Sequence, residues 1–212
     1  FNAIMRTIVG IPFFLDMMSS DSAFDASQHL TKLGSKKLSD FIGNIGPIVI
    51  PQRYGDDPLM GLCQIIVSQQ LSNQAARSIW SRLCEQLPDR SDRLHALAQD
   101  ESEHLGLSRA KRRTLSNLLK QDESWFETQI QATPENRFQA LTDLWGIGPW
   151  SVAMLELFVL KNPDVWSDGD LILRRISELL AGEADTDRAE WISSAAPFRS
   201  FLALYCWKLN DS

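Results

Sequence analysis

The sequence has few of the residues that disulfide-stapled and metal-binding proteins need. Its three cysteines, Cys63, Cys84 and Cys206, are odd in number and far apart, and its three histidines show no ligand spacing. A disulfide framework and a Cys-x-x-Cys metal site are therefore not expected. Buried, reduced thiols fit these cysteines better.

Long hydrophobic runs and an excess of positive charge are also missing. No stretch of about 18 consecutive apolar residues occurs, which argues against a membrane span. The formal net charge is −6, so any nucleic-acid surface has to be a local patch. One candidate is the stretch 105–120, which holds no acid and five bases: Arg109, Lys111, Arg112, Arg113 and Lys120. Taken alone, a solvated helix face is the commoner explanation of such a stretch.

Strand-like alternation is absent as well. The one extended run, Ile45–Gln52, contains two prolines and is interpreted as a connection. Helical periodicity dominates elsewhere, and the expected helix starts carry capping residues or first-turn prolines: Asp57-Pro58, Ser72, Ser108, Thr133-Pro134, Pro149 and Pro197. The pattern predicts an all-α fold of about ten helices with short turns.

The first 18 residues are expected to lie outside the folded domain. Their one arginine and the run IVGIPFFL weakly resemble a signal peptide, but a small-residue cleavage site is missing. We interpret residues 1–18 as an extension or disordered N-terminus, and residues 19–212 as the domain.

A tight turn between two predicted helices stands out in Leu144–Met154, LWGIGPWSVAM. Gly146 and Gly148 can adopt positive φ and expose their amides, and Pro149 fits the first turn of the next helix. That helix would begin with free N–H groups, which makes a phosphate site. A helix–helix corner with a glycine C-cap is the alternative.

The wider pattern from Leu141 to Ala153 favours the phosphate site. It allows Ile147 to insert between the two helices, which is typical of a helix-hairpin-helix motif. This motif holds DNA phosphates through backbone amides, so an acidic protein can still bind DNA.

A candidate catalytic carboxylate follows in NPDVWSDGDLILRRI. Gly169 precedes Asp170 at the start of a predicted helix and leaves room for a large group to approach. The helix N-terminus would keep the carboxylate ionised. Asp168 or Asp170 would serve equally well as an ordinary N-cap, and the residues alone do not separate the two roles.

The hairpin, an aspartate 20 residues beyond Trp150 and the LxLRR after it resemble the helix-hairpin-helix superfamily of DNA glycosylases. The alkylation-repair 3-methyladenine DNA glycosylases are the most similar group, and Ile65–Leu83 and Gly106–Leu118 also match it. The resemblance extends from Phe24 to the C-terminus. It implies two helical subdomains with a cleft between them: one of roughly residues 57–160, with the hairpin at 141–153, and one of residues 19–56 and 161–212.

The resemblance implies that Asp170 is the catalytic residue. It would oppose the positive charge that develops on deoxyribose as the N-glycosidic bond breaks, and help water attack C1′. Asp168 does not match the motif position. Trp150 stands where bifunctional relatives carry a lysine nucleophile, and the four C-terminal cysteines of iron–sulfur relatives are missing. The implied enzyme is monofunctional, needs no cofactor for its chemistry, and leaves an abasic site.

The substrate pocket implied by the resemblance is aromatic. An alkylated purine of the 3-methyladenine or 7-methylguanine type is cationic, and after base flipping it would lie against Trp150 and Trp207. Met154, one turn after Trp150, takes a position that is often aromatic in relatives. An ordinary core role is the alternative for Trp207.

The resemblance also assigns DNA contacts. Gln70, with Leu71, is the candidate wedge that fills the gap left by the flipped base, with a plain helix–turn–helix corner as the alternative. The hairpin residues that would meet phosphate are Gly146, Ile147, Gly148 and Ser151, through the amides of the glycines and the serine. The carbonyls of Thr142, Leu144 and Ile147 would hold a structural monovalent cation when DNA is bound.

Two other functions stay open: a glycosylase for a neutral lesion such as uracil or hypoxanthine, and a non-catalytic hairpin module that binds DNA. The expected partner is double-stranded DNA containing alkylated bases, with no membrane involved. The chain is expected to act as a monomer, in the cytoplasm with the nucleoid if bacterial and in the nucleus if eukaryotic.

Overall fold

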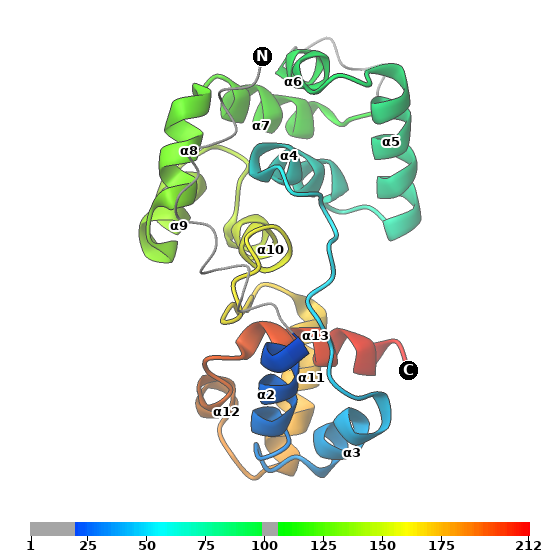
Figure 1. Cartoon of the computed structure of the whole chain (residues 1–212), viewed down its shortest axis with the longest axis vertical. Helices are drawn as coiled ribbons and strands as arrows, with labels where there is room; N and C mark the ends of the chain where they lie inside the picture. Colours follow the sequence, from blue (N-terminus) through cyan, green and yellow to red (C-terminus); the bar gives the residue numbers. More distant parts are fainter. Residues whose placement is uncertain (1–19, 99–105) are drawn as a thin grey trace. The chain divides into compact units, whose positions relative to one another are not determined.

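The computed structural model describes residues 20–98 and 106–212, so the predicted extension, residues 1–18, lies outside the described residues. The described residues form twelve helices and no strand (Figure 1), which confirms the all-α prediction. The chain divides into two compact units. The central unit is Gln52–Val159, and the terminal unit combines the described residues up to Pro51 with Leu160–Ser212.

The central unit is built around one apolar helix. Helix α4 (Pro58–Ser68) buries residues on all its sides and packs against α5, α7 and α10. A helix without a polar face has to lie in the interior. The helices of this unit are α4, α5 (Asn73–Gln86), α6 (Arg90–Ala98), α7 (Arg109–Leu119), α8 (Glu123–Gln131), α9 (Pro134–Thr142) and α10 (Pro149–Phe158).

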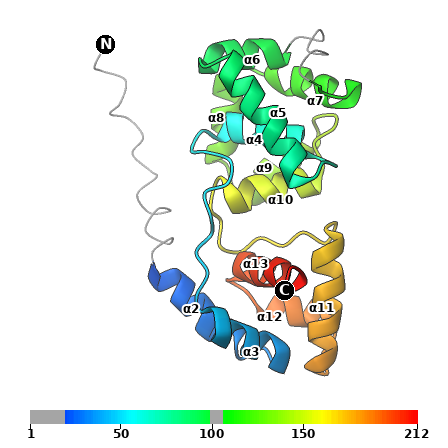
Figure 2. The ribbon, with the colours of Figure 1, turned by 90° about the vertical axis from the view of Figure 1, so that its right-hand side faces the viewer.

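The terminal unit is arranged around the last helix. Helix α13 (Arg199–Asn210) buries every residue from Ser200 to Cys206 and packs against α2, α3 and α11. Figure 2 shows α13 beside α11. The other helices of this unit are α2 (Ser20–Leu30), α3 (Lys36–Ile45), α11 (Leu171–Glu183) and α12 (Arg188–Ser194).

Most of the predicted helix starts have an N-cap side chain that accepts a nearby backbone amide. The side chains of Asp57, Ser72, Ser108 and Thr133 each accept a backbone amide as N-caps, which confirms those starts. The start predicted at Pro197 is wrong, because α13 begins at Arg199. Residue 198 keeps a non-helical backbone, with φ −117° and ψ 27°, and so delays the helix.

The cysteines are all free thiols, and two of them are buried. Cys63 and Cys206 lie in the cores of their units, while Cys84 is half-buried. Burial raises the pKa of Cys63 to about 12, so its thiol stays protonated at neutral pH. Among the helices that the structure describes, none has the length and apolarity needed to cross a membrane.

Candidate functional site

The predicted hairpin is formed by α9, the turn 143–148 and α10. Gly146 has φ +89°, and a Cβ atom there would lie 1.9 Å from Oγ1 of Thr114 on α7. Position 146 therefore requires glycine for two reasons, the positive φ of the backbone and the close packing against α7. Ile147 is 3% exposed, as expected for a side chain inserted between two helices.

The turn presents unused amides at the start of α10. Gly148 is the N-cap and offers no capping side chain. The amides of Gly146 and Gly148 make no hydrogen bond to any described residue, whereas the amide of Ser151 donates to the Gly148 carbonyl at 3.0 Å. Two of the three predicted phosphate donors are thus available at the positive end of a helix. The third already has an acceptor.

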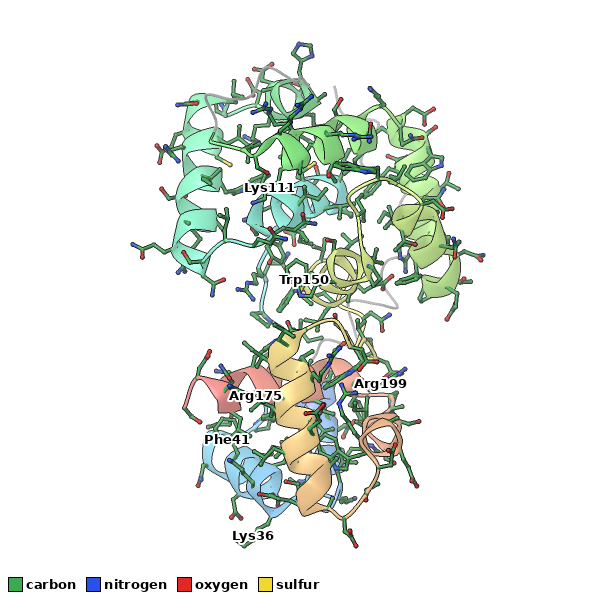
Figure 3. All side chains as sticks on the ribbon, turned by 180° about the vertical axis from the view of Figure 1, so that it is seen from behind. Lys36, Phe41, Lys111, Trp150, Arg175 and Arg199 are labelled. Atoms are coloured by element: carbon green, nitrogen blue, oxygen red, sulfur yellow. The ribbon has the colours of Figure 1, made fainter. Side chains whose placement is uncertain are left out.

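Part of the basic stretch on α7 has an internal role. Lys111 Nζ donates to the Val67 carbonyl at 2.7 Å, near the end of α4 (Figure 3). Burial lowers the pKa of Lys111. Arg112 is buried and donates to the Leu107 carbonyl at 3.2 Å. These two cations therefore support the helix packing, and only the other three, Arg109, Arg113 and Lys120, are exposed.

A buried ion pair joins the two hairpin helices. Arg137 of α9 donates from Nε to Oε1 of Glu156 on α10 at 2.6 Å, and both side chains are buried. Nη1 of the same arginine donates to the carbonyls of Gln129, Ile130 and Ala132 at the end of α8. This pair was not predicted from the sequence. Its one signal is an acid within the otherwise apolar run from Val152 to Leu160.

The candidate wedge lies in the connection between α4 and α5. Gln70 is exposed and has φ +56°, a conformation that costs free energy for a residue with a side chain. Leu71 is exposed as well. Gln69, which was not among the predicted site residues, donates from Nε2 to Oγ of the buried Ser151 at 2.8 Å. This hydrogen bond anchors the connection to the hairpin helix α10.

Asp170 is the N-cap of α11. Its Oδ1 accepts the amides of Ile172 and Leu173, each at 3.0 Å. The capping role left open by the sequence is therefore real. The surroundings are open: a Cβ on Gly169 would meet no heavy atom within 4 Å, and Leu171 is 76% exposed. The cap fixes a carboxylate at a place that a large group can approach.

The segment before Asp170 is fixed to the start of α13. Arg199 donates from Nε and Nη2 to the two carboxylate oxygens of Asp164, both at 2.7 Å, and holds the pKa of that carboxyl below its usual range. Ser200 Oγ donates to the Asn162 carbonyl at 2.6 Å and accepts the Val165 amide at 2.9 Å. These contacts make the position of the loop depend on the last helix.

Asp168, unlike Asp170, accepts hydrogen bonds from two side chains. Its Oδ1 accepts Nη2 of Arg188 at 2.8 Å and Nε1 of Trp166 at 3.1 Å. The hydrogen bond from Arg188 is the main cause of a lowered pKa at Asp168. The carboxylate thus holds α12 to the loop, which agrees with its position outside the motif.

The three predicted pocket residues differ in exposure. Trp207 is half-buried on α13, and Cys206 beside it has its pKa raised by burial and, second, by the negative charge of Asp170. Asp170 and this part of α13 are therefore neighbours within the terminal unit. Trp150 is half-buried at the start of α10 in the central unit (Figure 3). Met154 is 3% exposed, so neighbouring residues cover nearly all of it in this structure, and its contact with a substrate stays a prediction.

The three carbonyls that are predicted to hold a monovalent cation lie in and beside the turn, and the cation itself stays a prediction. The carbonyls of Thr142 and Ile147 accept no hydrogen bond from a described residue, and the Leu144 carbonyl accepts one, from Ile147 at 3.1 Å, which leaves it a second lone pair. Within residues 20–98 and 106–212, no cluster of histidine, cysteine, aspartate and glutamate has the arrangement of a metal site.

Comparison with known proteins shows which proteins this chain is similar to. No family model matches the chain. The alkylbase DNA glycosidase-like protein mag2 of Schizosaccharomyces pombe is 24% identical over 207 residues, 91% of this chain and 96% of the relative. DNA-3-methyladenine glycosylase 1 of the same organism is 27% identical over 200 residues, 87% of this chain and 86% of the relative.

A solved structure shows the same fold. The Schizosaccharomyces pombe 3-methyladenine DNA glycosylase Mag1, in complex with abasic DNA, matches with a TM-score of 0.71 and 25% identity, covering 89% of this chain and 97% of the other. The resemblance inferred from the motifs is therefore confirmed. The chain has homologues named as alkylbase and 3-methyladenine DNA glycosylases, and it has their helical fold.

Proposed function

We propose that the chain is a monofunctional DNA glycosylase of base excision repair. It hydrolyses the N-glycosidic bond of alkylated purines in double-stranded DNA and leaves an abasic site. The observation that carries the proposal is the carboxylate of Asp170, fixed by two amides at an open helix N-terminus. Support comes from the hairpin with its two unused amides and from the glycosylases among the relatives.

The role of Asp170 is electrostatic. As the bond between base and sugar breaks, positive charge develops on the deoxyribose, and a preorganised negative charge beside it lowers the barrier. The amides of Ile172 and Leu173 hold the carboxylate in one position. The same group is suited to orient the water that attacks C1′.

The aromatic residues suit a base that already carries positive charge. A cation over an indole gains roughly 0.5–2 kcal/mol, and a cationic purine is a good leaving group. The proposal assigns Trp150 and Trp207 to the flipped nucleotide. Met154, being buried, would instead support the position of Trp150 from within α10.

Chromatography of the bases freed from dimethyl-sulfate-treated DNA tests the proposed reaction. We expect 3-methyladenine and 7-methylguanine to appear with the wild-type protein. Release of uracil or hypoxanthine from matched substrates at a comparable rate would favour the neutral-lesion alternative. DNA binding without release of any base would favour the non-catalytic module.

A pair of glycine variants tests the phosphate site of the hairpin. Gly148→Ala adds a methyl group that meets no heavy atom within 4 Å, so its fold should persist at a capping cost of about 0.5–1 kcal/mol. The methyl would obstruct phosphate at the amides. Hydrogen bonds to charged groups are worth about 1.5–3 kcal/mol, so we expect DNA affinity to fall about 10- to 100-fold.

Gly146→Ala is the matched comparison. There the methyl would clash with Thr114 at 1.9 Å and occupy a positive-φ position, so this variant should lose stability as well as affinity. Fluorescence anisotropy with a duplex and thermal denaturation separate the two effects. Unchanged DNA affinity in a folded Gly148→Ala protein would contradict the phosphate site.

A further inference from the structure

An arginine of α7 stacks on a tryptophan of the hairpin turn. Cζ of Arg113 lies 4.1 Å from the centroid of the Trp145 ring, and the indole is 45% exposed. Thr114, the next residue of α7, packs against Gly146, the next residue of the turn. Two consecutive residues of the helix therefore contact two consecutive residues of the turn, which fixes α7 beside the unused amides.

The charge of this arginine is not neutralised. The side chain of Arg113 makes no ion pair or hydrogen bond with a described residue, and the same holds for the side chains of Arg109 and Lys120. Arg113 follows Arg109 by four positions, and Lys120, the C-cap residue of α7, follows Arg113 by seven, so the three residues lie along one side of the helix. All three are exposed, and the stretch 106–120 contains no acid. In a chain of net charge −6, this face is a local cationic surface beside the hairpin.

We propose that this face, Arg109, Arg113 and Lys120, is a second contact for the DNA backbone, continuous with the hairpin amides. Arg113 is its best-defined member, because the indole of Trp145 holds the plane of the guanidinium before DNA arrives and so reduces the ordering cost of binding. The N–H groups of a stacked guanidinium stay available for a phosphate. The inference rests on the proposed function only in that DNA is the ligand, since it requires no base release.

The salt dependence of binding tests the charge. Each phosphate neutralised contributes about −0.9 to the slope of log K against log salt concentration. We expect Arg113→Ala to reduce the slope for an undamaged duplex by about one such unit. Lys36→Ala is the control, because it also removes one positive charge but takes it from an ion pair with Asp40 on α3. An unchanged slope in Arg113→Ala would overturn the proposal.

A double-mutant cycle tests the stacking. Trp145→Ala should weaken DNA binding in the wild-type background and have no further effect in Arg113→Ala, while Trp145→Phe should keep most of the affinity. Equal losses in both backgrounds would mean that the indole acts independently of the arginine, which would contradict the stacked arrangement as the source of affinity.

Base release by the wild-type protein is measured separately, so the proposed glycosylase activity and the proposed α7 contact can be disproved independently of each other. If methylated bases are released while Arg113→Ala leaves the slope unchanged, only the α7 contact is wrong. If no base is released while the slope falls as expected, the contact stands and the proposed chemistry is wrong.

Discussion

Asp170→Asn is expected to lower the rate of base release by about 10²- to 10³-fold, the loss typical of removing one preorganised electrostatic group. Stability should hardly change, because asparagine caps a helix about as well as aspartate. Its side-chain oxygen can still accept the amides of Ile172 and Leu173. This variant therefore separates the proposed catalytic role of Asp170 from the capping role that the structure shows.

Three comparisons complete this experiment. Asp170→Ala should lose the activity and also about 0.5–2 kcal/mol of stability, since alanine cannot cap. Asp168→Asn, two residues away, should keep nearly full activity, because that carboxylate pairs with Arg188. Single-turnover release of 3-methyladenine gives the rates, and urea denaturation gives the stabilities. Equal rates in Asp170→Asn and wild type would disprove the catalytic assignment.

Glu156→Ala is expected to destabilise the central unit by roughly 3–5 kcal/mol, because it leaves the guanidinium of Arg137 buried without its carboxylate. Uncompensated burial of a charge is the dominant cost, so the loss should exceed that of an ordinary surface substitution. The hairpin helices α9 and α10 are the elements that this pair joins, so DNA affinity should fall together with stability.

The double variant Arg137→Met with Glu156→Leu is the decisive control. Replacing both charged side chains by apolar ones removes the buried ion pair without leaving an unpaired buried charge. The double variant should therefore recover much of the stability. Recovery will be incomplete, because Nη1 of Arg137 also donates to the Gln129 and Ala132 carbonyls at 3.3 and 3.0 Å. Urea denaturation checks both variants. A Glu156→Ala protein as stable as wild type would show that the pair contributes little.

Features that depend on neighbouring residues were predictable from the sequence. The N-caps at Asp57, Ser72 and Ser108 follow from bonds that span three residues or fewer, and the hairpin turn follows from the spacing of Gly146 and Gly148. Capping and turn formation use local backbone groups, so the local sequence carries the signal.

Features that depend on distant residues were not predictable. In the sequence, Lys111 cannot be distinguished from the other bases of its stretch. Its structural role depends on the hydrogen bond to the Val67 carbonyl, which only the folded structure shows. Position 146 requires glycine because Thr114, on another helix, occupies the space that a Cβ atom would need. Gln69 is as polar as Gln70, and only the tertiary structure directs one to Ser151 and leaves the other exposed. Tertiary contacts decide these roles, and spacing along the chain does not encode them.

The chain order of the two units has a consequence for biosynthesis. Gln52–Val159 is continuous, whereas the terminal unit needs segments from both ends of the chain. Domains generally fold as units during translation, with the earlier segments first. The hairpin-bearing part can therefore mature while the ribosome is still adding α11 and α13, and the aspartate acquires its supporting helix last. A nascent chain stalled after α10 would contain the hairpin proposed to bind DNA but would lack Asp170, the proposed catalytic residue.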